Sequence, residues 1–299
     1  MNDAFLAVIN PAAGGGRCRK LVAPALDRLR SGGIGLETAE TQGPGHGSQI
    51  VRQAWARGYR KFIAVGGDGT SYEIVNGLFP QDSRERPTLA FLPLGTGNSF
   101  LREFTERGVE HAIEALLARR SQPCDVLRMR HAEGVIHYIN LLSVGFAADV
   151  AALRARRFRS WGELGYQSSI FISLLRLQRR PFPLRVDSQA EIDRRPCLFL
   201  TFNNSKFTGG TMMIAPQAEV NDGLIEYVRW GAIGRIGLIR NLPTLYDGTH
   251  IHHPLAERCS AKQIDFYLDA AVDVMVDGEV LSLECKRLDV LPAVINVVV

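Results

Sequence analysis

The stretch FIAVGGDGTSYEIVNGL, residues 62–78, contains a short apolar run, a glycine-rich turn and a second run with helical character. Four consecutive apolar residues, Phe62 to Val65, are typical of a buried strand. The glycines at 66, 67 and 69 interrupt that strand, and a helix is expected over Ser71–Leu78. This stretch therefore predicts a strand, a tight loop and a helix in that order.

The same order of elements occurs three more times in the first 120 residues. Strands are predicted at Phe5–Ile9, Ile34–Ala39 and Thr88–Leu92, each followed by a Gly-rich loop (residues 10–16, 41–47 and 93–98) and a helix (near residues 21–29, 50–55 and 109–118). Alternating strands and helices of this length imply an α/β fold with a doubly wound, mostly parallel sheet and helices on both of its faces.

The pattern changes near Pro123, after which short alternating strands replace the strand–helix units. Such strands are predicted at 126–130, 184–186, 197–203, 223–228 and 271–276, with one helical stretch near 165–178. We therefore expect a nucleotide-binding α/β domain over residues 1–123. A β-rich domain over residues 124–299 would carry the lipid and metal sites, and its C-terminal segment could return to the first domain.

Composition and charge narrow the class of protein. The 299 residues are 46% hydrophobic and carry a net charge of +4, which is far below the basic footprint of a nucleic-acid-binding surface. The five cysteines form no Cys-x-x-Cys pair, so a reducing, cytoplasmic setting is expected. No apolar run reaches the roughly 18 to 20 residues of a membrane-spanning helix, and the first residues lack the basic start of a secretion signal.

The Gly-rich loops indicate a phosphate-binding site. The carboxyl ends of parallel strands meet at one edge of a sheet, where glycines and helix N-termini offer backbone N–H groups to anions. Gly66–Thr70 and Gly95–Asn98 both precede helices, which favours a nucleotide polyphosphate. About half of such turns are merely tight turns, and the sequence has neither a P-loop nor a Gly-x-Gly-x-x-Gly fingerprint after its first strand.

Several spaced motifs together resemble the diacylglycerol kinase catalytic-domain family, in particular its soluble bacterial lipid kinases. In the first half they are Asn10-Pro11 with Gly14–Gly16, Gly66–Thr70 with Glu73, Asn76 and Gly77, and Pro93–Asn98. In the second half they are Asn203-Asn204, Gly209-Gly210, Ala215-Pro216, Asn221–Leu224, Asp277–Glu279 and Val290–Pro292. These motifs cover nearly the whole chain in the family's order.

The resemblance implies an ATP-dependent lipid kinase whose first domain is NAD-kinase- or phosphofructokinase-like and whose second is a β-sandwich. It implies nucleotide contacts at Asn10, Thr41, Gly66, Gly67, Asp68, Gly69, Thr70, Ser71, Tyr72, Glu73, Gly95, Thr96 and Asn98. It also implies a Mg²⁺ or Ca²⁺ site formed by the Asp222 side chain and the main-chain carbonyls of Glu219 and Leu224. The proton acceptor is expected at Glu279, with Asp277 supporting it.

The chemistry of phosphoryl transfer, without the family resemblance, points to a similar set of catalytic residues. Phosphoryl transfer needs a divalent cation, donors for the phosphates and a carboxylate near the accepting hydroxyl, which Asp68, Asp277 and Glu279 supply if the two domains meet. The alternative is that Asp277-Gly278 is only the tight turn of a hairpin.

Other readings stay open. An NAD kinase shares the Gly-Gly-Asp-Gly-Thr turn, and a non-catalytic nucleotide-binding or lipid-sensing module would be favoured if the carboxylates were missing. The arginines at 154, 156, 157, 159, 176, 179 and 180 suit either an anionic membrane surface or plain solvent. The histidines at 250, 252 and 253 favour a solvated loop over a metal site. A lipid substrate places the chain at the membrane periphery, and a homodimer is left open.

Overall fold

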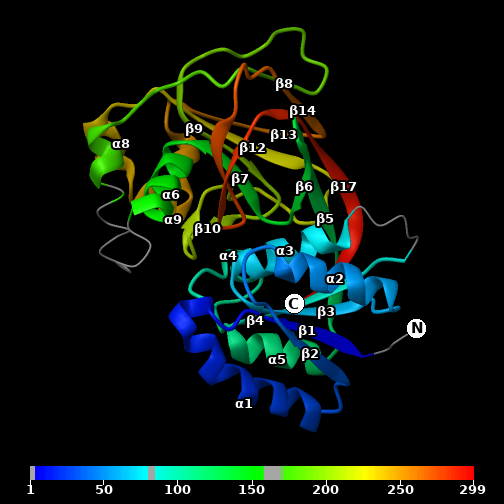
Figure 1. The fold of residues 1–299 in the computed structure, drawn as a ribbon. Coiled ribbons are helices and arrows are strands. Elements are labelled where there is room, and N and C mark those ends of the chain that lie inside the picture. The colour runs from blue at the N-terminus through cyan, green and yellow to red at the C-terminus, as the bar shows by residue number, and fades with distance from the viewer. Residues whose placement is uncertain (1–3, 80–84, 158–168, 170) are drawn as a thin grey trace.

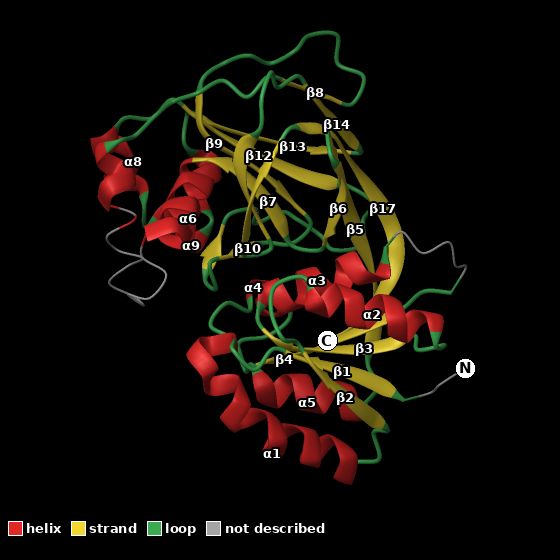
Figure 2. Cartoon of the chain, viewed as in Figure 1, coloured by secondary structure: helices red, strands yellow, loops and turns green. Residues whose placement is uncertain are grey.

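The N-terminal half of the computed structural model, which describes residues 4–79, 85–157, 169 and 171–299, contains the four predicted strand–loop–helix units (Figure 1). Its strands pair in parallel in the order β2-β1-β3-β4: β1 (Phe5–Ile9), β2 (Leu36–Glu40), β3 (Lys61–Gly66) and β4 (Thr88–Pro93). Its helices are η1 (Ala13–Gly16), α1 (Arg17–Ser31), α2 (His46–Ala56), α3 (Asp68–Leu78), α4 (Ser99–Arg102) and α5 (Val109–Leu117). Helices α1 and α5 cover one face of the sheet and α2 and α3 the other (Figure 2), which confirms the doubly wound prediction.

The second half is a β-sandwich. Its six-stranded antiparallel sheet has the order β13-β12-β9-β7-β15-β16: β7 (Leu141–Gly145), β9 (Cys197–Asn203), β12 (Ile225–Gly231), β13 (Ala256–Ala261), β15 (Val272–Val276) and β16 (Glu279–Leu283). The facing layer contains β5 (Ser121–His131), β6 (Gly134–Tyr138), β8 (Leu184–Val186), β14 (Gln263–Phe266) and β17 (Cys285–Val298). A separate hairpin pairs β10 (Phe207–Thr208) with β11 (Met212–Met213). The predicted α/β domain followed by a β-rich sandwich is thus confirmed.

Strand β17 joins the two halves into one hydrogen-bonded sheet. Its last residues pair in parallel with β4, with Asn296 opposite Thr88, and its earlier residues pair antiparallel with β14. Strand β5 runs beside most of its length, with an irregularity between Leu291 and Ile295. The boundary expected at residues 123 and 124 therefore lies inside a strand that contacts both halves.

Apolar side chains fill three layers. The first packs around the parallel sheet, and the second lies between the two sheets of the sandwich, where Tyr138 and Phe202 are fully buried. The third lies on the outer face of the six-stranded sheet around the buried Trp230. This outer face is covered by α6 (Phe146–Arg157), α8 (Arg235–Asn241) and α9 (Thr244–Asp247), with η3 (Thr249–His252) after them (Figure 1).

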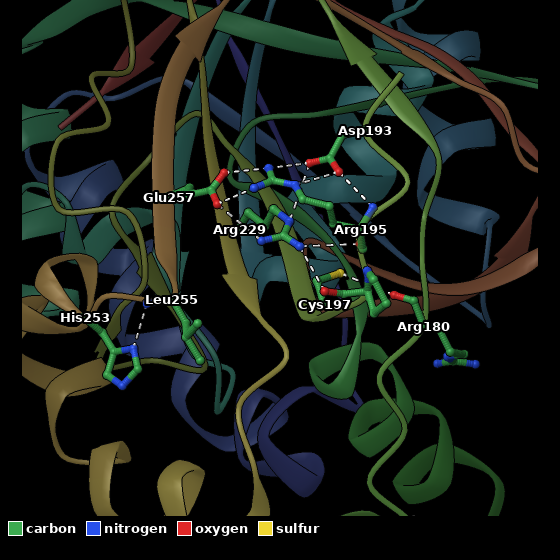
Figure 3. A network of polar contacts seen from close by, with 9 residues as sticks. Arg180, Asp193, Arg195, Cys197, Arg229, His253, Leu255 and Glu257 are labelled. Atoms are coloured by element: carbon green, nitrogen blue, oxygen red, sulfur yellow. Dashed lines mark hydrogen bonds and ion pairs between the residues drawn. The ribbon is translucent and has the colours of Figure 1, made fainter. Parts of the chain in front are cut away.

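A network of ion pairs ties the segment before β9 to strands β12 and β13 (Figure 3). Arg195 donates to both Asp193 and Glu257, and the buried Arg229 lies 3.5–3.6 Å from the same two carboxylates. Arg229 also donates to the carbonyl of Pro196 at 2.9 Å. Because Arg229 is nearly excluded from solvent, the two carboxylates supply the charge compensation that its burial requires.

Some predictions need correction or lie outside the described residues. His250 is buried rather than solvated, with its two ring nitrogens 3.2 Å and 3.1 Å from the carbonyls of Thr244 and Ile214. Arg159 and residues 165–168 and 170 of the helix expected at 165–178 lie outside the described residues, and of the rest of that helix residues 171–175 are helical, whereas 176–178 are not. None of the described helices is both long and apolar enough to span a membrane.

Candidate active site

The loops after β3 and β4 pack backbone against backbone. The N–H of Gly95 donates to the Gly66 carbonyl at 2.8 Å, and the N–H of Asp68 donates to the Gly97 carbonyl at 3.1 Å. A Cβ atom at Gly95 would lie 2.7 Å from the backbone N and Cα of Gly67. Only glycine permits this approach, so the two loops form one rigid backbone surface.

This surface lies at the N-terminus of α3, where backbone N–H groups and the helix dipole favour an anion. The Thr70 hydroxyl is buried without a hydrogen-bond partner among the described residues, a costly state that an additional acceptor would relieve. A pocket at the junction is lined by residues of both loops and of α4, including Gly66, Gly67, Asp68, Ser71, Asn98 and Phe100. The structure thus brings the predicted residues of the two loops together at the N-terminus of α3.

Asp68 fixes the start of α4 to this surface. Its carboxylate accepts the N–H of Ser99 at 3.0 Å and that of Phe100 at 3.5 Å. Burial raises the pKa of Asp68, and these hydrogen bonds partly oppose the rise. The structure therefore gives Asp68 a part in holding the two loops and α4 together.

The predicted Asp-Gly-Glu turn of the second half packs directly on this helix N-terminus. It joins β15 to β16, and Asp277 and Gly278 have positive φ values of 43° and 85°, as in a two-residue hairpin turn. A Cβ atom on Gly278 would lie 3.7 Å from the Cβ of Asp68, and one on Gly69 would collide with the Glu279 carboxylate. The turn is therefore both a tight hairpin and a contact with the Gly-rich loop.

The two carboxylates of the turn have different surroundings. Asp277 is buried and accepts backbone N–H groups from Ile139, Asn140 and Leu141 at 2.9–3.2 Å. Burial, aided by the charge of Asp68 and opposed by these hydrogen bonds, raises the pKa of Asp277 to about 7. Glu279 is exposed beside Gly69. Asp277 is thus placed to hold the turn, whereas Glu279 lies at the exposed side of its contact with the Gly-rich loop.

The raised pKa of Asp277 predicts a pH effect on stability. The folded chain retains this proton up to about pH 7, whereas the unfolded chain releases it near the ordinary pKa of 3.8, so raising the pH through this window destabilises the folded state. In Asp277→Asn this contribution is absent. Thermal unfolding between about pH 5 and pH 8 should show a smaller fall in the midpoint for the variant than for the wild type. Parallel curves would contradict the assignment.

Glu73 holds the predicted nucleotide loop at residues 41–47. Its two carboxylate oxygens each accept one backbone N–H at 2.7 Å, from Gly45 and from Gly47. The same loop begins at Thr41, whose N–H donates to the Ile9 carbonyl at 2.8 Å. Because both oxygens of Glu73 are engaged, its role in this structure is to position the loop.

The remaining predicted contacts lie around the same loops. The Asn10 side chain accepts the N–H of Ala12 at 3.1 Å after β1, and the Asn98 amide lies against the carbonyls of Gly66 and Gly97. Thr96 belongs to the loop after β4. Tyr72 is half-buried, and burial followed by the charges of Asp277, Glu279 and Glu73 raises its pKa.

Two residues that hold distant segments together, Asn76 and Asp125, had no predicted role. Asn76 on α3 donates to the carbonyl of His137 at 2.8 Å and accepts its N–H at 2.9 Å, so it locks α3 to β6. The buried Asp125 accepts the N–H groups of Gly223 and Ala293, both at 2.6 Å. For Asp125, the sequence contained only one signal, which is a carboxylate among the apolar residues of a strand. That signal did not show which backbone N–H groups the carboxylate would accept.

The predicted metal loop lies beside Asp125. The Asp222 carboxylate accepts the Leu224 N–H at 2.9 Å. Burial raises the pKa of Asp222, and the nearby charges of Asp125 and Glu219 raise it further. No three His, Cys, Asp or Glu side chains among the described residues converge on a shared metal position. The predicted site consists of one carboxylate and two main-chain carbonyls. The convergence of side chains does not test a site of that kind.

Comparison with known proteins follows this division of the chain. Residues 4–129 match the model of the diacylglycerol kinase catalytic domain, and residues 140–299 match that of the YegS C-terminal NAD kinase beta sandwich-like domain. The chain is 26% identical to the diacylglycerol kinase of Mycobacterium tuberculosis (strain H37Rv), covering 97% of this chain and 93% of that protein. It is 29% identical to a "Probable lipid kinase YegS-like" of Chromohalobacter salexigens, covering 91% and 86%. The crystal structure of a diacylglycerol kinase from Bacillus anthracis shares the fold, with a TM-score of 0.72, 20% identity and coverage of 99% and 96%.

Proposed function

Since the chain belongs to the family of diacylglycerol and YegS-like lipid kinases, which use ATP, we propose that it transfers the γ-phosphate of ATP to a hydroxyl of diacylglycerol or a related lipid. The observation that supports this most is the contact between the Asp277–Glu279 turn and the Gly-rich loop at Asp68 and Gly69. That contact supports the proposal because it brings carboxylates from one half to a helix N-terminus of the other half, a position that suits a phosphate.

In this proposal Glu279 is the general base. It accepts the proton of the lipid hydroxyl while that oxygen attacks the γ-phosphorus, the bond to the β-phosphate oxygen breaks, and ADP leaves. Asp277 is a positioning residue, because its oxygens are occupied by three backbone N–H groups. Asp68 is the residue of the Gly66–Thr70 loop that faces the turn, and its negative charge favours a cation there.

The nucleotide would bind along the carboxyl edge of the parallel sheet. The backbone of Gly66–Thr70 and Gly95–Asn98 would contact the phosphates. Asn10, Thr41 and Tyr72 border the same edge from the neighbouring loops and from α3. A Mg²⁺ ion accompanying ATP would neutralise part of the phosphate charge.

A second divalent cation, Mg²⁺ or Ca²⁺, fits the loop at Glu219, Asp222 and Leu224. The residues suit such an ion because Asp222 and Glu219 raise the local negative charge next to the buried Asp125. Carboxylate and carbonyl oxygens are the ligands that both ions prefer. When bound, the cation would compensate this charge and hold the 219–224 loop against β5 and β17.

Removing the ligand should test that site. Asp222→Ala is expected to lower the midpoint of thermal unfolding and the activity together, and extra Mg²⁺ should restore little of either. A chelator should lower the wild-type midpoint and leave that of Asp222→Ala nearly unchanged. Equal midpoints for the two proteins, with and without chelator, would make Asp222 an ordinary turn residue.

The competing functions predict different products. Purified full-length chain should transfer label from γ-labelled ATP with Mg²⁺ to diacylglycerol in mixed micelles, giving a labelled lipid phosphate. An NAD kinase would instead label NAD in a parallel reaction, and a non-catalytic module would label neither. Labelling of NAD alone, or of nothing, would overturn the proposal.

The site of action follows from the substrates. ATP is dissolved in the cytoplasm and the acceptor lies in a bilayer, so we place the chain at the cytoplasmic face of a membrane as a peripheral protein. The five cysteines are free, as that compartment would keep them.

A further inference from the structure

Four large apolar side chains are exposed on two neighbouring segments that project from the β-sandwich. Phe171 and Leu175, in the helical residues 171–175, are 62% and 59% exposed. Ile236 and Ile239 on α8 are 75% and 54% exposed. We call these four residues the apolar tip. Solvating that much apolar surface at one place is unfavourable unless another surface covers it.

The two segments are held together by specific hydrogen bonds. The Arg235 guanidinium at the start of α8 donates to the carbonyls of Leu174 and Leu175 at 2.9 Å and 2.8 Å. Arg179 donates to the Ile233 carbonyl at 2.9 Å. Leu238, on the opposite side of α8, is buried in the outer apolar layer. The apolar tip is therefore a built feature with an anchored base.

The charged residues that the structure describes on the two segments of the apolar tip are all positive. Arg176, Arg179, Arg235 and Arg240 are exposed beside it. Residues 169–186 and 230–246 contain no Asp or Glu. Two other arginines from the predicted basic runs are paired instead, Arg156 with Asp273 at 3.0 Å and Arg180 with Asp149 at 2.6 Å. The uncompensated positive charge thus gathers around the exposed apolar residues.

We propose that the apolar tip docks into the surface of an anionic lipid bilayer, with its apolar side chains between the acyl chains and the four arginines at the headgroups. This inference rests on the proposed function, because it names the surface from which the lipid acceptor would reach the site. Helix α8 lies at the outer side of the β-sandwich, beside α6 and α9 (Figure 1).

Charge complementarity favours a bilayer over a second copy of the chain. In a symmetric dimer the same patch lies on both sides of the interface, so the arginines of two copies would face each other and repel. An anionic bilayer supplies both the apolar layer and the negative charge. Arginine suits this position because its long side chain reaches phosphates while its stem stays beside apolar groups.

Vesicle co-sedimentation of the full chain, without ATP, tests the apolar tip. Wild-type protein should bind vesicles of equimolar phosphatidylglycerol and phosphatidylcholine. The double variant Ile236→Asn with Ile239→Asn should bind them at least about tenfold more weakly, since each side chain loses apolar burial. Val135→Asn is the matched control, because Val135 is 46% exposed on β6, far from α8, and should leave binding unchanged.

The basic residues are tested in the same assay. Arg176→Gln with Arg240→Gln should weaken binding to the anionic vesicles by roughly fivefold or more for each charge removed, and should not affect the weak binding to phosphatidylcholine alone. Both double variants should retain wild-type phosphorylation of diacylglycerol in mixed micelles, where no bilayer is needed. This activity arm separates failure of docking from failure of the proposed function.

Three results would overturn the docking proposal. The first is absence of wild-type binding to the anionic vesicles, and the second is binding by both double variants at the wild-type level. The third is a wild-type protein that sediments as a dimer and an isoleucine double variant that sediments as a monomer but binds vesicles as the wild type does. That result would assign the apolar tip to contact between copies of the chain.

Discussion

Replacing Glu279 by glutamine is expected to reduce lipid phosphorylation by about 10²- to 10⁴-fold, the usual cost of losing a positioned base. Glutamine keeps the size of the side chain beside Gly69 and removes its capacity to accept the hydroxyl proton. ATP binding should stay near wild type, because the surface that we propose for the phosphates consists of the backbone of the loops after β3 and β4. Turnover and nucleotide affinity should be measured separately, the first in mixed micelles and the second by calorimetry.

Two further variants make this result specific. Glu133→Gln makes the same chemical change at an exposed position in the turn between β5 and β6 and should leave turnover unchanged. Asp277→Asn should impair turnover as strongly as Glu279→Gln or more, because it disturbs the turn that carries Glu279. It should in addition alter the pH dependence of unfolding, because the raised pKa of Asp277 is then removed. Wild-type turnover in both variants of the turn would place the base elsewhere.

Substituting alanine for Gly95 should damage nucleotide binding by a different route. The new Cβ would lie 2.7 Å from backbone atoms of Gly67, and no side-chain rotation can relieve a contact with backbone. Separating the two loops should cost about 1–3 kcal/mol of stability, as overpacking does elsewhere. Because the N–H groups then lose their alignment, ATP affinity should fall by at least about tenfold, and the loss would appear in calorimetric titration.

Gly35→Ala is the control for that variant. A Cβ at Gly35 would meet only Ala4, at 3.7 Å, which is an ordinary contact. Its stability and ATP affinity should therefore match the wild type within error. If Gly95→Ala also bound ATP normally, close packing of these two loops would have no part in nucleotide binding.

The fold was predictable where local pattern and packing agree. Strand β3 is apolar on both faces because helices cover both, and the run Phe62–Val65 carries that information directly. Helix α3 begins three residues earlier than predicted, at Asp68, because Gly67 alone supplies the extended residue before it. The start of β5 at Ser121 was missed, since its pairing partner is the distant β17 and pairing at that separation leaves no local pattern.

The site was predictable in its parts more than in its contacts. The carboxylates at 68, 277 and 279 were singled out by residue type and motif, and the structure brings their segments together. Sequence could not show that three backbone N–H groups occupy Asp277, or that Asp125 binds the backbone of two distant loops. His250 was misread because a histidine among polar residues resembles a surface loop, whereas carbonyls of two segments enclose it.

The course of β17 has a consequence for how the chain acquires its structure during synthesis. The strand that pairs with β4 contains Asn296 and Val298, more than 200 residues after β4, so the parallel sheet lacks this neighbour until β17 has left the ribosome. Strands so far apart in the sequence pair slowly, because the long loop between them must close, with a loss of conformational entropy, before any contact offsets that loss. The exposed edge of β4 in the nascent chain is then open to wrong partners. We expect the two halves to unfold as one cooperative unit.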